Sequence, residues 1–274
     1  MSVQVPVSLP GHLGAPRRMG GPGPGVRGLT VAVLAAAALL SGCAQSVDPI
    51  ERLGKKAAQK VHPHESAYRR WGLAAPLARA PRPPSRPTVR SAGPALPPVV
   101  DRVPTRDKVV FLTYDDGAER DPRFVDMVRE LRLPVSMFLT DSVVGPGYGH
   151  FARLRSVGAS VQNHTLDHAS LRGLPYIGQR AQICGQQDKL KQRFGIRPRF
   201  FRPPYGAYDT TTLRAAADCG VAAIVLGRHA DARPLRPGDI LLGFDGPDQT
   251  EATTRLLRRV QKEGFTAGRL EDYL

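Results

Sequence analysis

From residue 107 onward the chain repeats one pattern, in which a short apolar run is followed by a segment with helical periodicity. Strands that alternate with helices in this way indicate an α/β protein with a mainly parallel sheet. Units of this length fit either a small barrel or an open sheet. The expected strands are 108–114, 134–140, 159–163, 197–201, 221–227 and 239–244, and the expected helices are 121–131, 149–158, 174–194, 209–220 and 249–264.

The N-terminal part of the chain carries the features of an export signal. Three arginines precede the twelve-residue apolar stretch at 29–40, which is too short to span a bilayer and is typical of a signal-peptide core. The sequence LSGC at 40–43 resembles the processing box of bacterial lipoproteins, in which the cysteine is lipidated. We therefore expect residues 1–42 to be a signal peptide and Cys43 to be the lipid anchor, with a plain secretory signal or an uncleaved anchor as the alternatives.

Residues 43–106 are expected to join this anchor to the body of the protein. Residues 76–106 contain nine prolines and many arginines, a composition typical of an extended, semi-rigid spacer. Such a spacer would hold the body away from the membrane. The predicted organisation is therefore a signal peptide at 1–42, a lipid-anchored segment with a Pro/Arg-rich linker at 43–106, and a catalytic domain at 107–274.

The composition narrows the partners and the state of the cysteines. A formal net charge of +15 favours binding to the anionic polymers and lipid head groups of a cell envelope. Nucleic acid is disfavoured because of the export signal and because no basic stripe with interleaved aromatic residues is present. If Cys43 is lipidated, Cys184 and Cys219 remain, and outside the cytoplasm they either form a disulfide or stay as two buried thiols. No feature of the sequence indicates an oligomeric state.

Polar residues gather where three of the expected strands end. Asp115 and Asp116 follow the first expected strand, His164 and His168 follow the third, and Arg202 follows the fourth. In α/β barrels the active site is built at the C-terminal ends of the strands and in the loops after them. Each feature alone is ordinary: a turn, two surface histidines and a salt-bridged arginine. Together at one rim they predict a functional site.

The residue types predict a metal site with a base beside it. Two neutral imidazoles and one carboxylate form a three-ligand set for zinc or a similar divalent ion, with positions left for water and substrate. Such an ion acidifies a bound water and polarises a carbonyl oxygen. Neighbouring carboxylates diverge on an extended backbone, so one of Asp115 and Asp116 is expected to bind the ion while the other acts as a base. Arg202 is placed to orient that base and keep it ionised.

Three motifs at these positions give a specific resemblance. LTYDDG at 112–117, NHTLDH at 163–168 and FRPPYG at 201–206 resemble the first three signature motifs of the polysaccharide deacetylase family, carbohydrate esterase family 4. They occur in the family's order, and the resemblance covers residues 107–274. It implies a distorted (β/α) barrel of mainly parallel strands. It also implies metal-dependent removal of acetyl groups from sugars, usually N-acetylglucosamine units.

The resemblance also assigns roles by position. Asp115 corresponds to the catalytic base, and Arg202 to the arginine that supports it. The backbone N–H of Tyr205 corresponds to the donor that stabilises the oxyanion. The metal ligands by this resemblance are Asp116, His164 and His168, and the residues that line the substrate pocket are Pro204 and Leu242.

The later part of the chain departs from the family pattern in two places. The family has a tryptophan and an aspartate near the fifth strand, where this chain reads IVLGRHADARP. The only tryptophan, Trp71, lies far upstream, and Asp231 is the candidate for the aspartate. In the last motif, GDILLGFD, Phe244 occupies the place of the histidine that acts as general acid. Because phenylalanine cannot protonate a leaving amine, His229 and Asp245 are the candidates to replace it.

The sequence therefore predicts an exported, lipid-anchored hydrolase at the outer face of the cytoplasmic membrane or in the cell wall. We expect it to use a divalent metal ion, zinc by preference, to remove acetyl groups from N-acetylated wall polysaccharide. Peptidoglycan is the first expected substrate, and a chitin-like polymer of N-acetylglucosamine is the second. Two alternatives stay open, namely an esterase for O-acetylated polysaccharide and a catalytically weakened lipoprotein that binds glycan.

Overall fold

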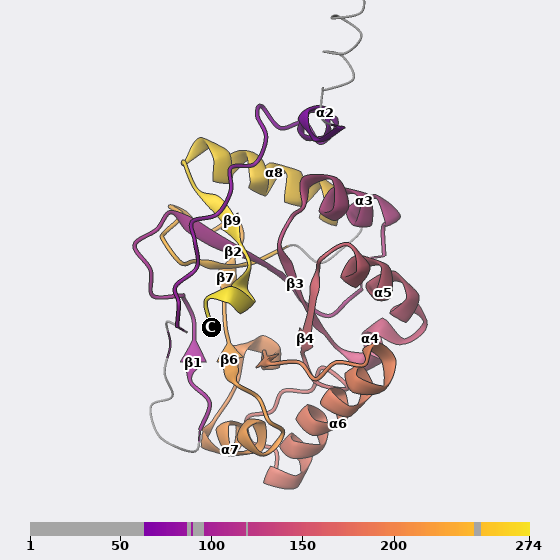
Figure 1. The fold of residues 1–274 in the computed structure, drawn as a ribbon. Coiled ribbons are helices and arrows are strands. Elements are labelled where there is room, and N and C mark those ends of the chain that lie inside the picture. Colours follow the sequence, from indigo (N-terminus) through magenta and orange to yellow (C-terminus); the bar gives the residue numbers. More distant parts are fainter. Residues whose placement is uncertain (1–62, 87–88, 90–95, 119, 244–247) are drawn as a thin grey trace, which may run out of the picture. The chain divides into compact units, whose positions relative to one another are not determined.

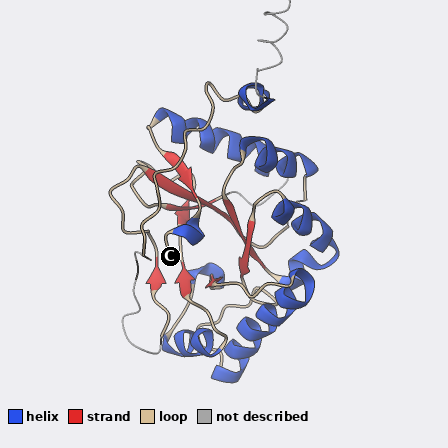
Figure 2. Ribbon diagram, in the orientation of Figure 1, coloured by secondary structure: helices blue, strands red, loops and turns tan. Residues whose placement is uncertain are grey.

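The computed structural model describes residues 63–86, 89, 96–118, 120–243 and 248–274. Within these residues one nine-stranded sheet curls on itself, in the order β1-β6-β5-β4-β3-β2-β8-β7, and β9 pairs with β2 as well (Figure 1). Helices lie on the outside of the curled sheet (Figure 2). The strands are β1 Val99–Val100, β2 Val109–Tyr114, β3 Val135–Leu139, β4 Ser160–Asn163, β5 Phe200–Phe201, β6 Ala223–Val225, β7 Arg228–His229, β8 Ile240–Leu242 and β9 Thr266–Gly268. The helices are α2 Pro63–Arg70, α3 Pro122–Leu131, α4 Asp141–Val144, α5 Tyr148–Ser156, α6 Tyr176–Phe194, α7 Thr210–Asp218 and α8 Gln249–Lys262, with 3-10 turns η1 Gly145–Gly147, η2 Pro204–Gly206 and η3 Leu270–Asp272.

All pairings between these named strands are parallel. The α/β class and the distorted barrel of mainly parallel strands are therefore confirmed. No helix in the described part of the chain is long and apolar enough to cross a membrane.

Strand β2 shows why an uninterrupted apolar run forms the centre of the sheet. All six of its residues are buried, as expected for a parallel strand with both faces covered. Successive side chains of a strand point to opposite faces. Accordingly, Val110 and Leu112 belong to the apolar cluster that includes Phe124 of α3, while Phe111 belongs to a second cluster inside the barrel with Phe138.

Helices α6 and α7 are joined by a disulfide between Cys184 and Cys219. The pairing of these cysteines, left open by the sequence, is therefore present. Helix α7 begins with a capping box, in which the Asp209 carboxylate accepts from the Thr212 N–H and the Thr212 hydroxyl accepts from the Asp209 N–H. This cap fixes the start of α7 directly after the FRPPYG motif.

Residues before the predicted boundary at 107 take part in the sheet and the core of the described structure. Trp71 is buried in the same cluster as Phe124 and its indole N–H donates to Glu130 of α3 at 2.8 Å. Strand β1 pairs with β6, and Arg102 forms an isolated bridge with Asp239. A catalytic unit that started at residue 107 would lack a strand of the sheet and a buried tryptophan.

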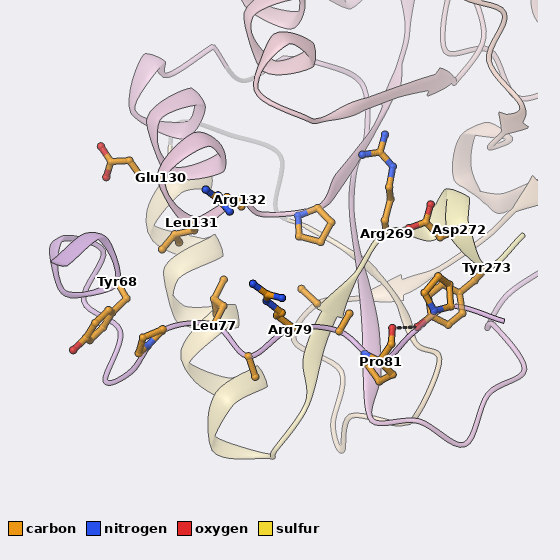
Figure 3. A pocket seen from close by; sticks show the side chains of 16 residues that line it. Tyr68, Leu77, Arg79, Pro81, Glu130, Leu131, Arg132, Arg269, Asp272 and Tyr273 are labelled. Atoms are coloured by element: carbon orange, nitrogen blue, oxygen red, sulfur yellow. Dashed lines mark hydrogen bonds between the residues drawn. The ribbon is translucent and has the colours of Figure 1, made fainter. Parts of the chain in front are cut away.

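The described part of the predicted spacer lies against the body. The carbonyl groups of Pro76 and Pro81 accept hydrogen bonds from Gln261 and Tyr273, both at 3.3 Å. A proline-rich segment has few N–H donors but exposes its carbonyls, which explains why side chains of the body hold it. A cavity of about 810 Å³ remains between this segment and the end of the barrel where Pro134 and Tyr273 lie (Figure 3).

The C-terminal segment closes the end of the barrel at which the strands begin. The Glu271 Oε1 atom accepts from the hydroxyls of Ser136 and Ser160 and from the Gln162 amide. These three donors stand on β3 and β4. Arg199, just before β5, adds hydrogen bonds to the backbone carbonyls of η3 and of the last residue.

Candidate metal and catalytic site

Three loops at the opposite end of the barrel bring the predicted site residues together. Asp115 and Asp116 directly follow β2, His164 and His168 follow β4, and Arg202 follows β5. The backbone binds these loops to one another. The Arg202 N–H donates to the Asn163 carbonyl at 2.9 Å, and the His164 N–H donates to the Leu139 carbonyl at 3.1 Å. The convergence at one rim, predicted from strand order alone, is present.

Asp116, His164 and His168 lie close enough to share one ion. The Asp116 Oδ1 atom is 3.4 Å from His164 Nε2 and 3.2 Å from His168 Nε2. One ligand atom from each residue lies within 4.8 Å of the other two. The separations match three donors around a small cation rather than a hydrogen-bonded triad.

The three ligand atoms have the surroundings that a bound divalent cation requires. Asp116 Oδ1 is buried and has no hydrogen-bond partner, a costly state for a carboxylate oxygen. The other nitrogen of each imidazole is taken, because His164 Nδ1 lies 2.8 Å from the Arg202 carbonyl and His168 Nδ1 lies 3.2 Å from the Tyr205 hydroxyl. Burial lowers the pKa of His164 below its ordinary value, which keeps its ring neutral and its lone pair available. When each ring carries its proton on Nδ1, the two Nε2 lone pairs face the Asp116 oxygen and repel it unless a cation lies between them.

Asp115 lies beside these ligands and is held by Arg202. The Arg202 guanidinium donates to Asp115 Oδ1 and to the Thr113 hydroxyl at 3.0 Å, and it lies over the Phe138 ring at 4.0 Å. Its remaining N–H groups donate to the carbonyls of residues 225 and 226, both at 3.1 Å. Because four of the five N–H groups of this buried guanidinium are hydrogen bonded, it is a fixed charge that holds the Asp115 carboxylate in one place.

Backbone strain is concentrated at the same rim. Among the described residues, five that are not glycine have a positive φ angle, and four of them belong to the site. Each such residue costs on the order of 1–3 kcal/mol and persists only where the surroundings fix it. The four are Asp116, Thr165, His168 and Tyr205. Such a concentration is typical of functional sites.

Side chains that sequence reasoning did not single out fix the histidine loop. Asn163 Oδ1 accepts from the Thr165 N–H at 2.9 Å, and the Thr165 hydroxyl accepts from the His168 N–H at 3.1 Å. The Thr140 hydroxyl donates to the His164 carbonyl at 2.9 Å. Two of these three residues, Asn163 and Thr165, lie inside the NHTLDH motif. The motif is therefore the sequence feature that could have identified them.

The other predicted positions lie at the edge of the site or outside the description. Pro204 is buried in η2, and Leu242 is half-buried at the end of β8. A Cβ added to Gly227 would lie 3.2 Å from Leu242 Cγ and 3.4 Å from an Arg202 nitrogen, so Leu242 lies near the supporting arginine. The positions outside the described residues are Cys43, Phe244 and Asp245.

The two remaining candidates, His229 and Asp231, are exposed. Asp231 acts electrostatically on Arg259 of α8. In the described part of the chain no hydrogen bond or ion pair joins either residue to Asp115 or to the three ligands.

Comparisons with known proteins agree with this geometry. A family model described as polysaccharide deacetylase matches residues 102–224. An uncharacterised protein of Streptomyces coelicolor is 59% identical over 199 residues, which cover 66% of this chain and 79% of that protein. A peptidoglycan-N-acetylglucosamine deacetylase of Bacillus cereus is 22% identical over 190 residues, which cover 60% of this chain and 86% of the relative.

A solved structure shows the same fold. It is a carbohydrate esterase family 4 pseudoenzyme from Bacillus anthracis, with a TM-score of 0.59 and 20% identity, and the match covers 65% of this chain and 69% of that one. The family match, the motif order and the fold lead to one assignment: this chain belongs to the polysaccharide deacetylase family of hydrolases.

Proposed function

We propose that this deacetylase removes acetyl groups from N-acetylglucosamine units of peptidoglycan, with a zinc ion held by Asp116, His164 and His168. One observation carries the proposal. The unpartnered Asp116 Oδ1 atom faces two imidazole Nε2 atoms beside a carboxylate that a buried arginine holds. The name of the Bacillus cereus relative supports peptidoglycan as the substrate.

The residues of the site divide the reaction among them. The ion, when bound, would polarise the acetyl carbonyl and lower the pKa of the water molecule that attacks it. Asp115 would accept the proton of that water, because its hydrogen bond with Arg202 holds the carboxylate in place. By its place in the motif, the Tyr205 backbone N–H would donate to the oxygen that becomes negative.

The leaving amine needs a proton, and here the chain differs from the family pattern. General acid catalysis contributes about 10²–10⁴-fold, and Phe244 cannot provide it. Without a general acid, the alcohol of an acetate ester leaves more readily than the amine of an acetamide. The presence of Phe244 therefore supports a second candidate function, hydrolysis of O-acetyl groups on wall polysaccharide or xylan.

The location of the enzyme is part of the proposal. The signal at 1–42 and Cys43 would anchor the chain at the outer face of the cytoplasmic membrane, within reach of the wall. Incorporation of labelled palmitate into the wild-type chain, with its loss in Cys43→Ser, would support this. Equal labelling of the two chains would remove Cys43 as the anchor.

The test is acetate release by the full chain, stripped of metal and then titrated with zinc, on peptidoglycan, chitooligosaccharide and acetylated xylan. We expect zinc-dependent release from the N-acetylated substrates, and a fall of about 10²–10⁴-fold in Asp115→Asn with zinc still bound. Release from the acetylated xylan alone would favour the esterase. No release from any substrate, with one zinc bound, would overturn the proposal in favour of a glycan-binding protein.

A further inference from the structure

The two ligand imidazoles are both oriented by one short segment, residues 202–205. The His164 Nδ1 atom lies 2.8 Å from the Arg202 carbonyl, and the His168 Nδ1 atom lies 3.2 Å from the Tyr205 hydroxyl. A carbonyl can only accept, so the Arg202 contact places the proton of His164 on Nδ1 and leaves Nε2 as the ligand atom. A phenol can accept or donate, so the Tyr205 contact sets the same tautomer in His168 when the phenol accepts.

The two histidines differ in how much the protein restrains them. The His164 side chain is 3% exposed, whereas that of His168 is 25% exposed. Water can therefore compete for His168 Nδ1 and its ring has more freedom to rotate. An imidazole in this position depends more on a hydrogen-bond partner to keep Nε2 directed at Asp116.

Tyr205 is arranged to be that partner. It is 74% exposed, so burial does not explain its conformation. Its backbone has a φ of 59°, a costly conformation for a bulky residue. Its ring meets the His168 ring edge-on, with centroids 4.8 Å apart and an interplanar angle of 70°. The strained backbone thus coincides with a phenol directed at the more exposed ligand.

We propose that Tyr205 is a positioning residue whose side-chain hydroxyl fixes the tautomer and orientation of His168 for metal binding. This role is separate from that of its backbone N–H, and it rests on the proposed metal site. The segment 202–205 then couples three parts of the site: Arg202 holds the base and orients one ligand, and Tyr205 orients the other.

The test compares the zinc affinity of the full-length wild type and Tyr205→Phe, measured by competition with a chromophoric chelator. Loss of such an outer hydrogen bond lowers metal affinity about 10–100-fold, and we expect a decrease toward the lower end because the ring contact is kept. Tyr208→Phe is the matched control, since this tyrosine lies in the same loop and, among the residues that the structure describes, only its backbone carbonyl is hydrogen bonded. Its affinity should equal that of the wild type.

A second readout separates positioning from a general structural effect. In ¹⁵N NMR spectra of the metal-free protein, His168 should carry its proton on Nδ1 in the wild type and show a mixture of tautomers in Tyr205→Phe. Unchanged affinity and tautomer in Tyr205→Phe would overturn this inference alone. A wild type that binds no zinc would instead overturn the proposed function.

Discussion

Two carboxylate oxygen atoms at opposite ends of the same strands, Glu271 Oε1 and Asp116 Oδ1, have opposite surroundings, although the Glu271 Oε2 atom is itself buried without a hydrogen-bond partner. At the end where the strands begin, Glu271 Oε1 accepts from three side chains. At the end where they finish, Asp116 Oδ1 is buried and accepts from none, although two imidazole nitrogens lie within 3.4 Å. Strand β4 contributes to both, because Ser160 and Gln162 face Glu271 while His164 follows its last residue.

The difference teaches how to separate a structural carboxylate from a functional one. Donors arranged around an anion stabilise the fold, since each hydrogen bond to a charged group contributes about 1.5–3 kcal/mol. Lone pairs arranged around an anion destabilise the fold until a cation binds. The strained backbone lies around the carboxylate that faces lone pairs, because four left-handed residues lie at the Asp116 rim. Among the described residues, no left-handed one lies in the strands or the turn around Glu271.

The largest expected effect comes from Asp116→Asn, which removes the charge but keeps the shape. The full chain should lose its bound zinc and its acetate release should fall to background, because two neutral imidazoles alone are a weak site. The metal-free variant should unfold at the same temperature as the metal-free wild type or higher, since a charged group whose buried Oδ1 atom has no hydrogen-bond partner has been neutralised. Zinc analysis and thermal unfolding by circular dichroism measure both effects. A full equivalent of zinc retained by Asp116→Asn would show that Asp116 is not a ligand.

The sequence predicts the residues at the Asp116 end of the strands, but not the hydrogen bonds around Glu271 at the other end. The rim residues lie in contiguous motifs directly after apolar runs, so strand order was enough to bring Asp115, His164 and Arg202 together. The Glu271 network joins Ser136 to a residue 135 positions later, and no local pattern signals such a contact. The hydroxyl of Tyr205 was missed for a related reason, because its role depends on a left-handed backbone.

The docked N-terminal segment was also beyond sequence reasoning. Trp71 and Leu73 are two apolar residues beside a Pro/Arg-rich stretch. The composition of that stretch predicts an extended spacer, and two apolar residues are too few to indicate a packed segment. Their burial depends on a surface formed by α3 and α8, which lie far away in the chain.

A second prediction tests whether this segment belongs to the body. Trp71→Ala should destabilise the full chain by about 3 kcal/mol, typical of a buried large-to-small change. Trp71→Phe should cost less, about 1 kcal/mol, because it mainly removes the hydrogen bond to Glu130. Denaturant unfolding measures both, and zinc affinity should stay constant because the site lies at the other end of the strands. A chain in which Trp71→Ala unfolds like the wild type would support the predicted boundary at residue 107.

The smallest expected effect concerns the structural carboxylate itself. Glu271→Ala leaves the donors of Ser136, Ser160 and Gln162 facing a space, and should cost about 2 kcal/mol. Glu271→Gln keeps an acceptor oxygen in the same place but loses the charge, which roughly halves the strength of such hydrogen bonds, so about 1 kcal/mol is expected. Neither variant should change zinc affinity or acetate release per bound zinc, in contrast to Asp116→Asn. The contrary outcome is that both Glu271 variants unfold like the wild type while Glu271→Gln lowers zinc affinity. Glu271 would then act on the opposite rim through the shared strand β4 without stabilising the fold. The two carboxylates could in that case not be divided into a structural and a functional one.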